Sequence, residues 1–230
     1  QGTLVLPDGT QYSGEFRHDR KSGHGVLTSP RGTPLYIGDW EEDLQHGVGV
    51  ERWADGSTYH GQFVAGEKHG RGHFVWNNGC VYEGDFCANE MHGDGSYAWN
   101  DGRMYSGKWQ NNSMGPSGNM QWPDGRVYQG GFRNGRRHGE GTHWWPDGRS
   151  YKGQWFEGRQ HGTGLARDLR GEACRGVWES GIFVRWLDPA PAEASPLVPP
   201  PDLSVDECVL ASSEGAADPP AAGTAAVPAG

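Results

Sequence analysis

The stretch PDGRVYQGGFRNGRRHGEG, residues 123–141, recurs in nearly the same form along the chain. It stands as ADGSTYHGQFVAGEKHGRG at residues 54–72 and as PDGRSYKGQWFEGRQHGTG at residues 146–164. A phrase that returns in register indicates a structural unit that is used many times. Internal repeats therefore have to be established before any single residue is assigned to a site.

One tyrosine marks each copy of the unit, at Tyr12, Tyr36, Tyr59, Tyr82, Tyr105, Tyr128 and Tyr151. The spacing is constant from Tyr36 onward and is longer by a single residue between Tyr12 and Tyr36. One more step of the same length reaches Cys174, where CRGVW resembles the YKGQW that begins at Tyr151. The sequence thus predicts seven repeats and a degenerate eighth over residues 1–186.

Each repeat has the pattern of a β-hairpin. In YEGDF, residues 82–86, the aromatic residues and glycine alternate with acidic residues, and GSYAW at residues 95–99 alternates in the same way. This period of two places aromatic rings and glycine on one face of a strand. NDG at residues 100–102 and PDG at residues 123–125 are turn signals, because glycine accepts a positive φ. The polar segment and the His-Gly-x-Gly phrase between the strands are expected to form a loop.

Tyr-x-Gly-x-Trp/Phe followed by His-Gly-x-Gly at this period resembles the MORN repeat family, over about four-fifths of the chain. The resemblance implies an all-β fold, an elongated single-layer antiparallel sheet of tandem β-hairpins. It also implies protein scaffolding and membrane–cytoskeleton attachment rather than catalysis. Three places depart from the pattern: SGHG at residues 22–25, GPSG at residues 115–118, and the eighth unit, which lacks both the tyrosine and the His-Gly phrase.

Composition divides the chain into two regions. Residues 187–230 contain no Lys, Arg or aromatic residue, and Pro, Ala, Ser and acidic residues dominate. Such a segment cannot bury enough apolar surface to offset the entropy of ordering, so a disordered acidic tail is predicted. The formal charge of −9 is the sum of −7 in this tail, −7 in residues 1–125 and +5 in residues 126–186. This balance argues against general nucleic-acid binding.

No catalytic or metal site emerges from the repeat background. The repeat histidines are one hairpin apart, about 9.5 Å, whereas ligands of one zinc ion lie about 2 Å from it. We expect these histidines to cap their loops by hydrogen bonding: His46, His69, His92, His138 and His161. The Gly-x-Gly phrases lack the third glycine and the following helix of a dinucleotide site. The sequence therefore predicts no enzyme, no cofactor and no metal.

The aromatic face is the candidate binding site. A single-layer sheet has no second layer to cover that face, so some rings should be reachable and form a groove for an extended peptide or a helix. The predicted groove residues are Tyr36, Trp53, Tyr59, Trp76, Tyr82, Trp99, Tyr105, Trp122, Tyr128, Trp145 and Tyr151. The first hypothesis is thus a non-enzymatic scaffold that binds a partner protein in a cytoskeletal or ciliary assembly.

The alternative hypothesis is a tether that binds anionic phospholipid at a membrane surface. It requires clustered basic residues, and the basic repeats near the C-terminus supply Arg133, Arg136, Arg137 and Arg159. These arginines are predicted to stand along one edge of the sheet. The other repeats do not carry such clusters, so the scaffold is favoured.

The expected setting is reducing and intracellular. Cys80, Cys87, Cys174 and Cys208 form no CxxC pair and no disulfide spacing. We expect a cytoplasmic protein, associated with the cytoskeleton, a cilium or the surface of a membrane. The chain begins at Gln1 rather than Met, which indicates a fragment, and the sequence leaves the oligomeric state open.

Overall fold

The structure is a computed structural model that describes residues 1–189 and 198–200. Of the predicted tail, residues 190–197 and 201–230 lie outside the described residues, so the disorder expected there stays a prediction. The last strand ends at Pro189, slightly beyond the predicted end of the repeats. Every regular element in the described ranges is a β-strand, which confirms the all-β prediction.

The strands form one antiparallel sheet of 17 strands and fall into two compact units. The first unit, residues 1–95, holds β1 (Gly2–Val5), β2 (Gln11–Arg17), β3 (Arg20–Thr28), β4 (Pro34–Glu41), β5 (Leu44–Arg52), β6 (Thr58–Val64), β7 (Glu67–Val75), β8 (Val81–Cys87) and most of β9 (Glu90–Ala98).

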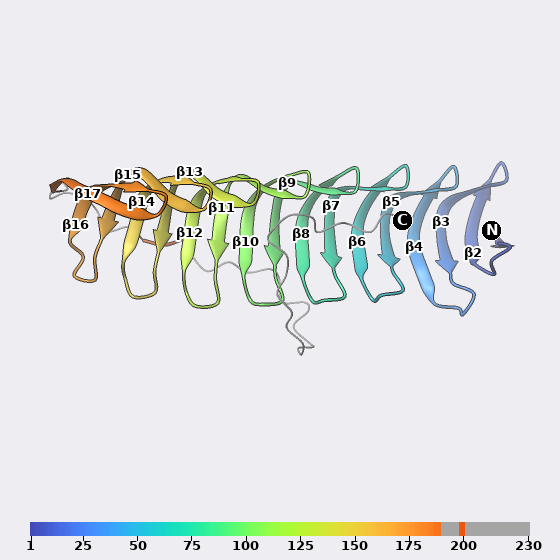
Figure 1. Cartoon of the computed structure of the whole chain (residues 1–230). Helices are drawn as coiled ribbons and strands as arrows, with labels where there is room; N and C mark the ends of the chain where they lie inside the picture. Colours follow the sequence, from blue (N-terminus) through green and yellow to red (C-terminus); the bar gives the residue numbers. More distant parts are fainter. Residues whose placement is uncertain (190–197, 201–230) are drawn as a thin grey trace. The chain divides into compact units, whose positions relative to one another are not determined.

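The second unit begins at Ser96 and holds β10 (Met104–Gln110), β11 (Ser113–Gln121), β12 (Val127–Arg133), β13 (Arg136–Trp144), β14 (Ser150–Phe156), β15 (Arg159–Arg167), β16 (Ala173–Glu179) and β17 (Ile182–Pro189). Within each unit, consecutive strands lie side by side in chain order (Figure 1), and their registers are antiparallel. The meander of hairpins predicted from the repeats is confirmed.

Two kinds of turn connect the strands. Within a hairpin the turn is formed by a pair such as Ala88 and Asn89, whose φ angles of 49° and 68° are those that a type I′ turn needs. Between hairpins the turn contains the predicted Asp-Gly. Asp101 Oδ1 accepts a hydrogen bond from the backbone N–H of Arg103 at 3.1 Å, and Gly102 has a φ of 84°. The turn prediction for the Asp-Gly and Asn-Gly pairs is therefore correct.

The His-Gly-x-Gly phrase does not form a loop, so that expectation is wrong. His69 and Gly70 lie inside β7, where the register passes from Gly61↔Gly72 to Gln62↔His69. The extra residues are thus accommodated as a bulge, and Gly70 has a φ of 56°. The side-chain oxygen of Gln62 accepts a hydrogen bond from the N–H of Arg71 in the bulge at 3.1 Å. Because glycine tolerates this conformation, the strand continues through the phrase rather than ending before it.

A row of glycines crosses each unit at the centre of its strands. Gly14↔Gly25, Gly25↔Gly38 and Gly38↔Gly49 are directly opposed pairs in the first unit, and the second unit repeats the arrangement from Gly107 to Gly176. The repeat tyrosine lies over the glycine pair of its own hairpin. A Cβ atom added to Gly153, for example, would lie 2.5 Å from Gly164 Cα and 2.9 Å from the Tyr151 hydroxyl.

The repeat tyrosines form the core above this row. Each is at most 1% exposed, and each hydroxyl donates to the carbonyl of the residue three positions later at 2.8–3.2 Å. Each ring also makes an edge contact with the second aromatic residue of its own repeat, and most contact that of the next repeat as well. Tyr59 lies between Phe63 and Phe86, with both ring centroids at 5.1 Å. Successive hairpins are therefore joined by ring contacts as well as by backbone hydrogen bonds.

We predict that Gly153→Ala destabilises the chain by about 3 kcal/mol, the upper end of the usual cost of overpacking, because the added methyl group meets backbone atoms and cannot be accommodated by a rotamer change. Gly148→Ala is the matched control. Gly148 has a φ of 93° and open space around the added Cβ, so only the backbone strain of about 1–2 kcal/mol is expected. Thermal unfolding followed by tryptophan fluorescence measures both variants. Equal losses would contradict the close packing of tyrosine on glycine.

Candidate functional site

The face of the sheet that carries the repeat tyrosines and tryptophans, hereafter the aromatic face, has a buried floor and a half-buried border. The tyrosines predicted to line a groove are buried, so they support the face from beneath and offer almost no surface to a partner. The tryptophans predicted for the groove are half-buried, which leaves ring surface accessible: Trp53, Trp76, Trp99, Trp122 and Trp145.

In the second unit an arginine stacks on each of these tryptophans. The guanidinium carbons of Arg103, Arg126 and Arg149 lie 5.1, 5.4 and 5.6 Å from the ring centroids of Trp99, Trp122 and Trp145. Each arginine also pairs with the aspartate of its own turn, at 2.7–2.8 Å. Each indole ring thus has a cation–π contact with an arginine that is itself oriented by an ion pair.

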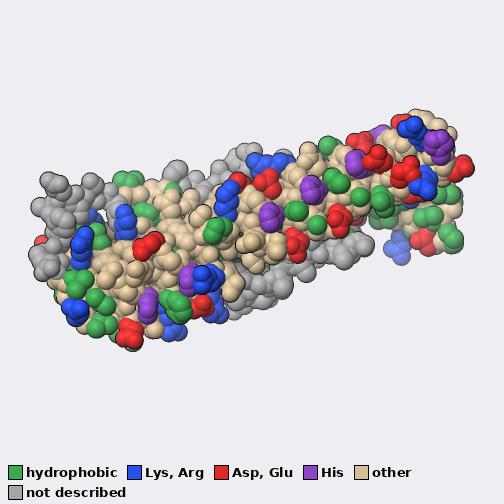
Figure 2. Space-filling view, turned by 90° about the horizontal axis from the view of Figure 1, so that it is seen from above, with side chains coloured by type: hydrophobic (Ala, Val, Ile, Leu, Met, Phe, Trp, Pro, Cys, Tyr) green, Lys and Arg blue, Asp and Glu red, His purple; other side chains and the backbone are tan. Residues whose placement is uncertain are grey.

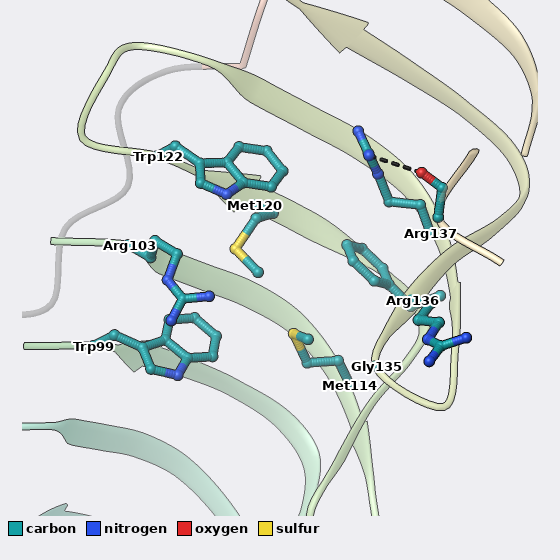
Figure 3. A pocket seen from close by; sticks show the side chains of 10 residues that line it. Trp99, Arg103, Met114, Met120, Trp122, Gly135, Arg136 and Arg137 are labelled. Atoms are coloured by element: carbon teal, nitrogen blue, oxygen red, sulfur yellow. Dashed lines mark hydrogen bonds between the residues drawn. The ribbon is translucent and has the colours of Figure 1, made fainter. Parts of the chain in front are cut away.

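A pocket of about 240 Å³ opens on the aromatic face at repeat five, the repeat that begins at Tyr105. Its lining includes the rings of Trp99 and Trp122, and Figure 3 shows the side chains of Met114 and Met120 in the space between the indoles and Arg137. Both methionines are buried, at 4% and 6% exposure. The methionines give the pocket an apolar and adaptable floor, because methionine side chains are flexible.

Arg137 supplies a positive charge to the same pocket. It is half-buried, and its guanidinium carbon lies 4.3 Å from the centroid of the Trp155 ring. Nη2 donates to the carbonyl of Gly158 at 2.8 Å, which is drawn in Figure 3, and Nη1 lies 3.3 Å from Nδ1 of His143. Burial lowers the pKa of the Arg137 guanidinium from its usual value.

The four arginines predicted to form one basic edge do not lie in equivalent surroundings. Arg133 and Arg159 are exposed. Arg136 is exposed but paired with Glu157 at 2.8 Å, and Arg137 is directed to the aromatic face. Successive residues of β13 alternate in direction, so the two arginines have different partners although both border the pocket. On the face seen in Figure 2, basic side chains are interspersed with acidic ones.

His143 is a buried titratable group beside the pocket. It is 2% exposed and its ring centroid lies 4.5 Å from that of Trp145. Burial, reinforced by the positive charges of Arg137 and Arg126, lowers the pKa of His143 to about 4. The imidazole is therefore neutral at pH 7, and its Nδ1 can accept the hydrogen bond from Arg137.

Neither the histidines of the repeats nor other side chains assemble a metal site in the described ranges. His46 pairs with Glu41 at 3.3 Å, and Nδ1 of His161 accepts from the N–H of Ser180 at 3.4 Å. No described residue belongs to a helix that could span a membrane.

Sequence reasoning missed Met114, Met120 and Arg103. The signal for the methionines was present, because repeat five is the interior repeat that departs from the pattern. That this departure creates a pocket could be seen only in the structure, since a pocket depends on which side chains meet across neighbouring hairpins.

A family model described as the MORN repeat matches residues 12–33, 36–58, 59–81, 82–102, 128–148 and 151–166, more than half of the chain. The matched segments omit residues 103–127. The pocket methionines lie in this interval, so the site occupies the repeat in which the chain departs from the family pattern.

Among curated proteins, the chain is similar to Alsin of Mus musculus and of Homo sapiens, with 36% identity over 67 residues. This match covers 27% of the chain and spans 4% of the length of Alsin.

Among solved structures, the chain is similar to the TCP10 domain of Danio rerio CPAP in complex with a peptide of STIL. The identity is 12%, the TM-score is 0.39, and the match covers 80% of this chain and 97% of that one. The TCP domain of Drosophila melanogaster SAS-4 in complex with a proline-rich motif of Ana2 matches at 12% identity and a TM-score of 0.29, over 76% of this chain and 83% of that one. At these TM-scores nothing about function follows from the likeness.

We predict that acid destabilises the chain through His143. The unfolded imidazole has a pKa of about 6.5 and the folded one about 4, so below pH 6.5 the unfolded chain binds a proton that the folded chain excludes. This contribution is fully present above pH 6.5 and falls by about 3 kcal/mol at most as the pH is lowered to 4.

His143→Gln is the matched variant, because glutamine does not titrate and can still accept from Arg137. Melting temperatures measured from pH 7 to pH 4 should fall more steeply for the wild type than for the variant. Carboxylates titrate in both proteins and cancel in the comparison. Parallel curves would show that His143 is not kept neutral by its surroundings.

Proposed function

Because the chain belongs to the MORN repeat family, we propose that it is a protein-interaction scaffold whose aromatic face binds an extended segment or a helix of a partner protein. The matched family is a repeat family and indicates no enzymatic activity. The observation that carries the proposal is the pocket between Trp99 and Trp122 in repeat five. Half-buried tryptophans stacked by arginine around a pocket resemble protein-binding hot spots, which are enriched in Trp, Tyr and Arg.

The half-buried tryptophans are the contact residues in this proposal. An indole ring offers a large contact surface at little cost in conformational entropy, and the arginine stacked on it reduces that cost further. A side chain of the partner in the pocket would anchor the segment, and neighbouring tryptophans would contact the residues on either side.

Binding to anionic phospholipid is less well supported. Two of the four arginines proposed for it are engaged, Arg136 with Glu157 and Arg137 with Gly158 on the aromatic face. Arg133 and Arg159 remain as exposed basic groups, which is fewer than a polybasic lipid site uses.

We predict that Trp99→Leu and Trp122→Leu each weaken peptide binding by roughly 30-fold or more, the loss of about 2 kcal/mol that defines a hot spot. The probes are 12-residue peptides selected from a display library on the wild-type chain, and fluorescence anisotropy measures their affinity. Phe156→Leu is the control, because this ring is 52% exposed and lies at a strand position whose parity points away from Trp155.

The melting temperature of each variant is measured alongside its affinity. If folded Trp99 and Trp122 variants bind the peptides as tightly as the wild type does, the aromatic face is only a core. Sedimentation with phosphatidylserine vesicles tests the lipid alternative, with Arg133→Gln and Arg159→Gln as its variants.

A further inference from the structure

Three residues of the first unit form a polar cluster on the aromatic face. The side-chain amide of Gln45 donates to Glu51 Oε1 at 3.4 Å, and Lys68 Nζ lies 3.0 Å from Glu51 Oε2. Lys68 and Glu51 side chains are 4% and 15% exposed, so this is a buried ion pair. The ammonium group also lies 4.7 Å from the Trp53 ring centroid and 5.5 Å from that of Tyr59.

The same three positions in the second unit, three repeats later, are Met114, Met120 and Arg137. Two of the aromatic rings around the cation are preserved. Arg137 lies 6.0 and 5.7 Å from the ring centroids of Trp122 and Tyr128, the equivalents of Trp53 and Tyr59. The carboxylate is not preserved, because the residue equivalent to Glu51 is Met120.

Arg137 therefore lies against the rings equivalent to Trp53 and Tyr59, but among the described residues it lacks the carboxylate that Lys68 has. Its polar contacts are the carbonyl of Gly158 and the neutral imidazole of His143, and within residues 1–189 no carboxylate forms an ion pair with it. A cation that is withdrawn from water without a counterion is costly. The pocket of about 240 Å³ lies beside this charge, with Met120 and Arg137 both in its lining.

We propose that the pocket receives an aspartate or glutamate side chain from an acidic segment of a partner protein. The partner's carboxylate would pair with Arg137 as Glu51 pairs with Lys68, and its methylene groups would lie against Met114, Met120 and the two indoles (Figure 3). This inference rests on the proposed function and specifies the chemistry of the partner.

A single carboxylate fits the site better than a membrane surface does. Arg103 and Arg136, the other basic residues of the lining, are already paired with Asp101 and Glu157. One cation that has no carboxylate partner within residues 1–189 matches one charged side chain, whereas binding to anionic lipid depends on several exposed basic groups.

The first test places a carboxylate at position 120, the position equivalent to Glu51. Met120→Glu should pair with Arg137, whereas Met120→Gln supplies the same shape without the charge. Thermal unfolding of the two variants, each alone and combined with Arg137→Met, forms a double-mutant cycle. Met120→Glu is expected to raise the melting temperature relative to Met120→Gln only when Arg137 is present. Equal effects in both backgrounds would show that a carboxylate in the pocket does not reach Arg137, and would overturn the inference.

The second test uses the 12-residue peptides selected on the wild-type chain. The selected peptides should carry Asp or Glu at one fixed position, and replacing it by Asn or Gln should weaken binding by at least about tenfold. Met120→Glu should weaken binding by a similar factor, because its own carboxylate occupies the site, and Met120→Gln should leave the affinity close to that of the wild type. Arg137→Lys should bind, since lysine occupies the equivalent position 68, and Arg137→Met should not.

The outcomes separate this inference from the proposed function. Peptides that depend on Trp99 and Trp122 but need no acidic residue would overturn the inference and leave the scaffold intact. If no selected peptide depends on these tryptophans, the proposed function fails and the inference fails with it. Arg137-dependent binding to phosphatidylserine vesicles, without binding to acidic peptides, would assign the pocket to lipid headgroups and would also overturn the inference.

Discussion

The packing of one tyrosine ring on a pair of opposed glycines is the contact on which each repeat depends. Because the two opposed glycines carry no side chain, the tyrosine ring can lie directly against the backbone. Its hydroxyl then reaches the carbonyl of the residue three positions later. Burial raises the pKa of these hydroxyls above the ordinary value, as for Tyr59, so they remain protonated donors. A larger residue in place of either glycine would displace the ring and disturb its contact with the second aromatic residue of the hairpin. The tyrosine and the two glycines of a repeat therefore depend on one another for packing.

The same constraint separates structural from variable positions on the aromatic face. Tyrosine, glycine and the second aromatic residue are occupied by the core in every complete repeat. The residue type differs between repeats at two further positions, one near the start of each second strand and one two residues before the closing tryptophan. Lys68 and Glu51 occupy them in one place, and Arg137 and Met120 in another. Binding specificity can thus differ along the sheet while the backbone stays regular.

Repeat five illustrates how a local departure creates a site. Its segment GPSG replaces the usual His-Gly-x-Gly, and its two methionines replace polar side chains of an earlier repeat. The tryptophans on either side keep their positions, because each is stacked by an arginine that is paired within its own turn. The pocket consequently has rigid walls and an adaptable floor.

The fold could be predicted from the sequence, because the repeating pattern specifies strands and turns from residues that are close together in the chain. The regular spacing of the tyrosines, the alternation in YEGDF and the Asp-Gly turns determined the strands, the turns and the order of the hairpins. The bulge at Gly70 was missed because a positive φ favours glycine equally in a loop and in a strand, and only the register distinguishes the two.

The chemistry of the site was decided by the tertiary structure. Met120 and Arg137 belong to different repeats and meet only because neighbouring hairpins bring them together. The different partners of Arg136 and Arg137 depend on strand parity, and the neutral state of His143 depends on burial beside Arg137. Sequence pattern determined where rings and glycines recur, whereas burial and cross-strand contact determined which charges are paired among the described residues.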